Sequence, residues 1–181
     1  FIDSLIRKLQ TAINIAPLDS KSFVIMYCDE TNDDISFQIY NTNSSVIIGE
    51  TDIVQYAAGA SPCIDETYSA YSVIALNSTR FVTAWITGSG RGDGFFKVYD
   101  ISGATITEAV SFVDGYYLGF SMAALNNTAF AIAYSKGDGG GNYPAYVDTY
   151  DYLGNKKLTA NPTTFNGDTP NFALAAFNDN L

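Results

Sequence analysis

The sequence predicts an all-β protein made of tandem four-stranded antiparallel units of about fifty residues each. An anchor of Leu followed by Asn or Asp recurs at Leu18, Leu76 and Leu125, which stand 58 and 49 residues apart, and Phe177-Asn178 begins a fourth copy. Tyr and Phe are abundant, at 13 and 12 residues, and both favour strands. Each of the first three anchors leads into a polar turn and then an apolar run, which is the order expected of a hairpin.

The first two strands of each unit flank the anchor. First strands are expected over residues 13–18, 71–76, 120–125 and 172–177. Second strands are expected over residues 23–27, 81–85 and 130–134, which read FVIMY, FVTAW and FAIAY. Because these second strands are apolar without a gap, both of their faces are expected to be buried.

The third and fourth strands are expected to be less buried. Third strands over residues 35–40, 95–99 and 145–150 alternate between apolar and polar residues, as half-buried strands do. A turn then follows at a fixed offset from Tyr40, Tyr99 and Tyr150, reaching Ser44, Gly103 and Gly154. Fourth strands over residues 46–54 and 104–110 are the most variable. Burial therefore falls from the second strand to the fourth, as it does in a propeller blade.

These repeats divide the chain into a segment over residues 1–12, units over 13–68, 69–117 and 118–170, and the start of a fourth unit over 171–181. The pattern LN-x(3)-F-x(3)-W…Y-D-x-x-G, over roughly residues 13–181, resembles the repeats of extracellular bacterial and archaeal β-propeller proteins. The resemblance implies propeller blades, here in an incomplete propeller. WD, kelch and sialidase signatures are absent from the sequence, and tandem β-sandwiches or a β-solenoid remain structural alternatives.

The first segment has two interpretations. Residues 1–9 can form the turn between the third and fourth strands of a preceding unit. One face of a short amphipathic helix would also be formed by Phe1, Ile2, Leu5, Ile6, Leu9 and Ile13. Because no initiator Met is present, we expect a processed or excised chain, whose missing strands come from a longer chain or a neighbouring copy.

Composition excludes several classes of partner. Nine basic residues against 19 acidic ones give a net charge of −10, which disfavours nucleic acid and anionic membranes. No apolar run approaches the ~20 residues of a membrane-spanning helix. Few charges together with many Ser, Thr, Asn and Tyr residues predict an extracellular protein.

The sequence contains no histidine, which removes Ser-His-Asp and Cys-His catalysis and His-based metal sites. We therefore name no catalytic residue and expect a protein that is not an enzyme. Asp29, Glu30, Asp33 and Asp34 are weak candidates for binding Ca²⁺, without the spacing of a one-loop calcium site. Asp93 and Asp138 lie in similar Gly-rich loops, and solvated hairpin turns are the favoured interpretation of all of them.

Three N-glycosylation sequons begin at Asn43, Asn77 and Asn126. Asn77 and Asn126 occupy the same turn of successive units, and Asn43 lies in a turn expected at the same edge of the sheets. The two cysteines, Cys28 and Cys63, are expected at the opposite edge. They are interpreted either as buried free thiols or as a disulfide that would fasten one unit to the next.

Aromatic residues suggest two roles. Tyr27, Trp85 and Tyr134 end the second strands and are expected to pack between units rather than to stack on sugars. Tyr116, Tyr117 and Tyr143 are weak candidates for sugar stacking. The tripeptide Arg91-Gly92-Asp93 matches a short adhesion motif by its letters alone.

These observations predict a non-enzymatic extracellular structural or adhesive repeat protein, a surface or filament subunit assembled through unpaired edge strands. A carbohydrate-binding, lectin-like propeller module is the first alternative, and a fragment of a propeller glycosidase is the second, which would need a carboxylate pair.

Overall fold

The computed structural model describes residues 13–29, 34–43, 45–54, 71–86, 93–102, 104–107, 109–113, 119–137, 143–160 and 173–175. These residues form three four-stranded antiparallel sheets and contain no helix, so the all-β prediction is confirmed. In each sheet the strands are hydrogen-bonded in chain order. The boundaries predicted between units lie outside the described residues and stay a prediction.

The strands have the following bounds. Sheet 1 contains β1 (Asn14–Pro17), β2 (Ser22–Asp29), β3 (Asp34–Asn41) and β4 (Val46–Val54). Sheet 2 contains β5 (Tyr71–Asn77), β6 (Arg80–Ile86), β7 (Gly94–Asp100) and β8 (Val110–Val113). Sheet 3 contains β9 (Phe120–Asn126), β10 (Ala129–Ser135), β11 (Ala145–Asp151) and β12 (Lys156–Ala160).

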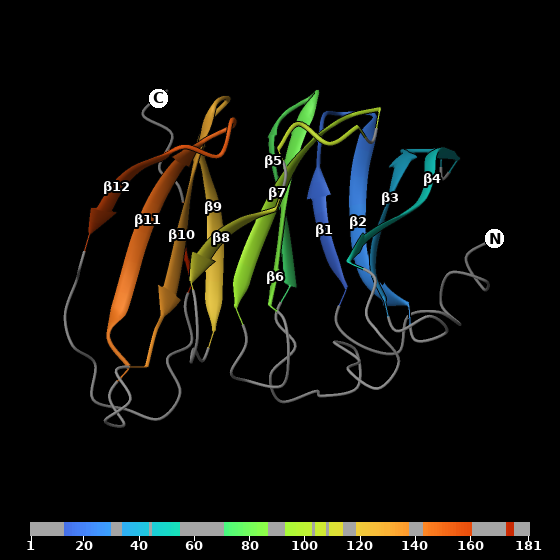
Figure 1. Ribbon diagram of the computed structural model, residues 1–181. Helices are drawn as coiled ribbons and strands as arrows, with labels where there is room; N and C mark the ends of the chain where they lie inside the picture. Colours follow the sequence, from blue (N-terminus) through green and yellow to red (C-terminus); the bar gives the residue numbers. More distant parts are fainter. Residues whose placement is uncertain are drawn as a thin grey trace.

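The three sheets stand face to face in a row, with their first strands as neighbours. Strand β5 lies against both β1 and β9 (Figure 1). We call the side that carries Tyr40, Tyr99 or Tyr150 the back face of its sheet and the opposite side the front face. The front face of sheet 1 packs on the back face of sheet 2, and the front face of sheet 2 packs on the back face of sheet 3.

The same aromatic triad occupies both interfaces. Phe37 on the front of sheet 1 meets Phe81 and Tyr99 edge-on, with ring centroids 5.0 and 4.8 Å away. Phe96 on the front of sheet 2 meets Phe130 and Tyr150 in the same way, at 5.1 and 4.7 Å. The Phe and Tyr of each back face stack on one another. Equivalent residues therefore have equivalent surroundings, as a stack of repeats requires.

The burial gradient across each sheet is confirmed. Strands β6 and β10 are buried at every position after the first, whereas all five residues of β12 are exposed. Strands β7 and β11 alternate as expected. The expectation of alternation is wrong for β3, which is buried at six of its eight positions. Its back-face positions Ser36 and Tyr40 are buried as well as its front-face ones.

Two predicted strands differ from the structure. The fourth strand of sheet 2 was expected over residues 104–110, but β8 covers Val110–Val113. The earlier described residues form an isolated bridge between Tyr99 and Thr105 and donate to the Val98 carbonyl from the N–H groups of Ile106 and Thr107. Thr107 explains the shift, because its Oγ1 accepts a hydrogen bond from the Val98 N–H and so replaces a ladder bond. In the strand expected over 172–177, the described residues 173–175 form no strand, although the Leu174 N–H donates to Ser121 Oγ of β9 at 3.1 Å.

Candidate functional site

The turns that join the first and second strands, and those that join the third and fourth, gather at one edge of the molecule. We call this edge the turn edge, and one Asn or Asp side chain closes each of its turns. These residues are Asp19, Asn41, Asn77, Asp100, Asn126 and Asp151. Each carboxylate or amide oxygen accepts backbone N–H groups two to four residues ahead, so the turns are held without help from other sheets.

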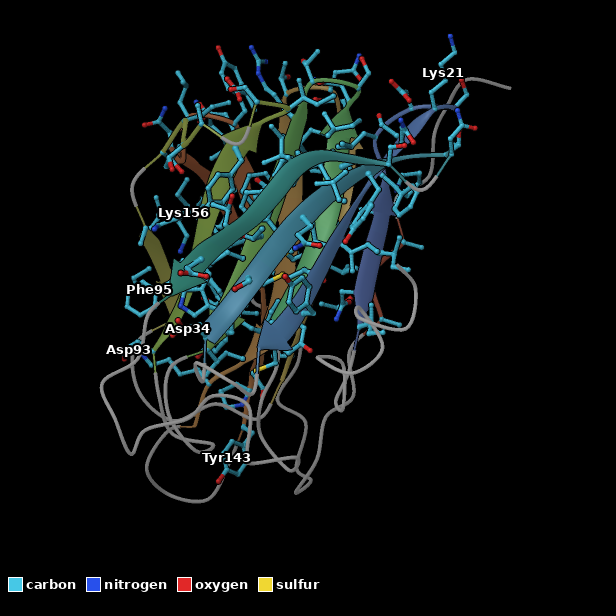
Figure 2. The ribbon with its side chains drawn as sticks, turned by 90° about the vertical axis from the view of Figure 1, so that its right-hand side faces the viewer. Lys21, Asp34, Asp93, Phe95, Tyr143 and Lys156 are labelled. Carbon is cyan, nitrogen blue, oxygen red and sulfur yellow. The ribbon has the colours of Figure 1, made fainter. Side chains whose placement is uncertain are left out.

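Within each sheet the two turns are also tied to each other. The Thr42 N–H donates to the Lys21 carbonyl at 2.7 Å, and Ile101 and Tyr152 donate in the same way to Thr79 and Thr128, at 3.0 and 2.9 Å. Figure 2 shows Lys21 at this edge, with Asp93 and Tyr143 toward the opposite edge. The turn edge is therefore a repeated, rigid surface.

The turn carboxylates are more acidic than ordinary carboxyl groups. The Lys21 N–H and the Ser22 hydroxyl lower the pKa of Asp19, and the Ser102 hydroxyl lowers the pKa of Asp100. At Asp151 burial raises the pKa, but hydrogen bonds from Lys157 and Asn155 outweigh it and lower the pKa to about 2. These groups stay charged at any ordinary pH, which keeps the turns closed.

All three sequon asparagines lie on the turn edge, but they are not equivalent. Asn43 and Asn126 are exposed, whereas Asn77 is half-buried. Asn77 Nδ2 donates to the Asn127 carbonyl of sheet 3 at 2.9 Å. Close by, the Arg80 guanidinium lies 4.2 Å above the Tyr152 ring. Asn77 therefore helps to join sheets 2 and 3 as well as closing its own turn.

A buried carboxylate lies between sheets 2 and 3. Asp148 on the back face of sheet 3 is fully buried, and its Oδ2 accepts hydrogen bonds from Tyr134 and Tyr150 at 2.9 and 3.3 Å. The Lys156 ammonium lies 2.6 Å from the same oxygen, while Oδ1 has no hydrogen-bond partner among the described residues. The cluster thus joins β10, β11 and β12 around one negative charge.

The two tyrosines of this cluster are held in the neutral form. Burial raises the pKa of Tyr134, with a further rise from its hydrogen bond to Asp148, and burial and the Asp148 charge raise the pKa of Tyr150. They therefore act as hydrogen-bond donors rather than as bases. The Asp148 carboxylate is thus fixed by three donors, one from each of β10, β11 and β12, an arrangement that stabilises the pairing of these strands.

Asp148 was not among the residues predicted from the sequence. The sequence pattern that could have identified it is an acidic residue two positions before the Tyr of an alternating third strand. That spacing places the acidic residue on the same face of the strand as the buried Tyr. Gln38 and Lys97 occupy the equivalent positions in sheets 1 and 2, so this position is polar in all three sheets. Lys97 is also engaged, because its Nζ donates to the Ile53 carbonyl of sheet 1 at 3.3 Å.

The weak Ca²⁺ candidates are only partly described. Asp29 ends β2 and is paired in register with Asp34, which begins β3 and is buried, while Glu30 and Asp33 lie outside the described residues. Among residues that the structure describes, no group of three or more acidic or Cys side chains is placed to hold a metal ion. Of the other loop residues, Arg91, Gly92 and Asp138 also lie outside, and Asp93 is half-buried.

Cys28 forms a disulfide. Cys63, the other cysteine of the sequence, lies outside the described residues, so its pairing with Cys28 stays a prediction.

The aromatic ends of the second strands pack in the core, as expected. Tyr27, Trp85 and Tyr134 are all buried, and Trp85 and Tyr134 lie in the two interfaces between sheets. They are not available for stacking on a sugar. Tyr143 is half-buried, and Tyr116 and Tyr117 lie outside the described residues.

Comparison with known proteins supports the fold and no more. A scan against models of protein families found no match, and a search of curated proteins found none either. The chain is similar to a solved structure titled "Crystal structure of the eukaryotic initiation factor", with 15% identity and a TM-score of 0.52. The match covers 87% of this chain and 33% of the other, so the chain spans about a third of that structure's length. Within the described part, no helix is long and apolar enough to span a membrane.

Proposed function

We propose that this chain is a non-enzymatic extracellular structural repeat protein whose sheets are propeller blades. The arrangement that supports blades is the contact of β5 with both β1 and β9, together with the burial that falls toward the fourth strands. The rigid turn edge is the surface that such a protein presents to its surroundings.

We further propose that the protein assembles with copies of itself through an outer edge strand. The supporting observation is that the three outer strands differ in length, charge and exposed apolar residues. Strand β12 carries Lys156 and Lys157, and β8 has only four residues, two features that protect sheet edges. Strand β4 has nine residues, pairs only with β3 in the described part, and exposes Val46 and Ile47. A long edge strand with exposed apolar residues favours pairing with another chain.

The sequons fit the same proposal. Asn43 and Asn126 are exposed on the turn edge, where an attached sugar would meet solvent. Asn77 is the least accessible of the three because it is half-buried and bonded across sheets. A sugar mass on peptides that contain Asn43 or Asn126, isolated from a secreting host, would support extracellular presentation, and unmodified peptides would contradict it.

Light scattering of a concentration series tests the assembly. We expect the wild type to exceed its monomer mass of 19.5 kDa at micromolar concentration and the Ile47→Lys variant to return to it. Leu158→Lys on β12 is the matched control, because Leu158 is exposed on an edge that is already basic, and it should leave the mass unchanged. A wild type that stays at 19.5 kDa would overturn the assembly proposal.

A further inference from the structure

Two buried groups that can donate hydrogen bonds lie between sheets 1 and 2. Thr83 and Trp85 follow Phe81 at alternate positions of β6, so all three side chains share the back face of sheet 2. Thr83 is completely buried and Trp85 is 3% exposed. Thr83 Oγ1 and Trp85 Nε1 have no hydrogen-bond partner among the described residues. Because a buried polar group without a partner is costly, a bound ligand or water is expected to supply one.

A cation lies beside these two groups. Lys97 is directly opposite Thr83 in the register of β6 and β7, and its Nζ lies 5.9 Å from the centroid of the Trp85 ring. The Lys97 side chain is half-buried, and one of its three N–H groups donates to the Ile53 carbonyl. In the described part of the chain Lys156 has a carboxylate partner, whereas Lys97 has none. The back face of sheet 2 therefore gathers a positive charge and two donors without a carboxylate.

The interface between sheets 2 and 3 carries an anion at the equivalent place. Asp148 occupies in sheet 3 the position that Lys97 occupies in sheet 2, and Tyr134 occupies the position of Trp85. The Tyr134 hydroxyl donates to Asp148 Oδ2 at 2.9 Å, and the Lys156 ammonium lies 2.6 Å from the same oxygen. An aromatic donor and a cation thus surround a carboxylate in one interface. In the other interface an aromatic donor and a cation are present, but the carboxylate position is itself the cation.

We propose that a small monovalent anion such as chloride binds between sheets 1 and 2 at Thr83, Trp85 and Lys97. The indole N–H and the ammonium group can only donate, and the Thr83 hydroxyl can donate as well. An anion accepts hydrogen bonds from all three groups and balances the charge of Lys97, whereas a water molecule leaves that charge unbalanced. Trp85 belongs to a closely packed cluster that includes Cys28 and Phe37, which favours a monatomic ion over a bulky one.

The fluorescence of Trp85 tests the proposal, because Trp85 is the single tryptophan of the chain. Bromide quenches indole fluorescence and serves as the probe, with sodium gluconate holding the ionic strength constant. Binding predicts quenching that saturates with bromide and that chloride reverses by competition. Collisional quenching of a side chain that is 3% exposed would instead be weak, linear in bromide and insensitive to chloride.

Two variants locate the bound ion. Lys97→Met removes the charge, and Thr83→Val removes the hydroxyl at nearly the same volume. Each should weaken bromide binding about tenfold or more, since each removes a hydrogen bond to a charged group. Lys21→Met is the matched control, because it removes the same charge from an exposed side chain of the turn edge, and it should leave bromide binding unchanged.

Thermal unfolding gives a second readout. Chloride should raise the Tm of the wild type above its value in gluconate, because a ligand of the folded state stabilises it, and it should raise the Tm of Lys97→Met less. The proposal is overturned if bromide quenching is linear and insensitive to chloride, or if Lys97→Met and Lys21→Met bind bromide equally well. Either result would assign an ordered water to the two buried donors. These measurements do not depend on molecular mass, so this proposal and the edge-strand assembly fail separately.

Discussion

The interface between sheets 1 and 2 and the interface between sheets 2 and 3 share their apolar contacts and differ in their polar ones. Both contain a Phe meeting a stacked Phe–Tyr pair with nearly the same ring separations. The polar position two residues before the Tyr is Lys97 in one interface and Asp148 in the other. Lys97 reaches a carbonyl of the neighbouring sheet, whereas the hydrogen bonds and the ion pair of Asp148 come from its own sheet. The aromatic triads thus determine how the sheets stack on one another, whereas the residue at the polar position can carry either charge.

Replacing the Phe of either triad is expected to have the largest effect. Phe37→Ala and Phe96→Ala should each lower the free energy of unfolding by about 3–5 kcal/mol, since both rings are fully buried and leave a cavity. Urea denaturation of the two variants measures the losses, with the partly exposed Phe95→Ala as the control that should lose less. A loss below about 1 kcal/mol for only one of the two triad variants would show that the two interfaces are not equivalent.

The polar positions should respond unequally. Lys156→Met should cost about 1–3 kcal/mol, because it removes the cation beside the buried Asp148 carboxylate, although Lys156 itself is about half exposed. Lys97→Met should cost less than about 1 kcal/mol, because it removes one bond to a carbonyl.

A double-mutant cycle sharpens this comparison. Adding Asp148→Asn to Lys156→Met should recover part of the loss, since a neutral amide needs no counter-ion. Strictly additive losses, measured by the same urea denaturation, would show that Asp148 and Lys156 do not interact.

Acid should produce the smallest effect, and it should fall on the turn edge. The pKa of Asp151 is about 2 in the folded protein, below its ordinary value of 3.8, so its contribution to stability is present above about pH 4 and lost as the pH falls through about 2. Thermal unfolding between pH 5 and 2 measures this loss. Asp151→Asn should flatten the acid limb while keeping the turn, because Asn41 closes the equivalent turn of sheet 1. An unchanged acid limb would assign the loss to other carboxylates.

The positions of the apolar strands could be predicted well from the sequence, because a strand is recognised from the pattern of neighbouring residues. The second strands and the turn residues from Asp19 to Asp151 lie where spacing placed them. The fourth strand of sheet 2 was misplaced because the Val98 N–H donates its hydrogen bond to the Thr107 hydroxyl instead of to a strand carbonyl. Hydrophobic periodicity does not predict such a side-chain hydrogen bond. The role of Asp148 could not be predicted, since Tyr134, Tyr150 and Lys156 converge on it only after three strands have paired.

Gly154, in the turn between β11 and β12, is constrained both by its backbone conformation and by the neighbouring sheet. Its φ of +82° is one that residues with a Cβ rarely adopt, and an added Cβ would lie 3.0 Å from the Val110 side chain of sheet 2, the neighbouring sheet. This one residue therefore serves both the bend of its hairpin and the spacing to the neighbouring layer. A duplicated unit inserted at this point in the row of sheets would have to keep a glycine at this position in order to pack on its neighbour. The other residues of its turn could be substituted without displacing the neighbouring sheets.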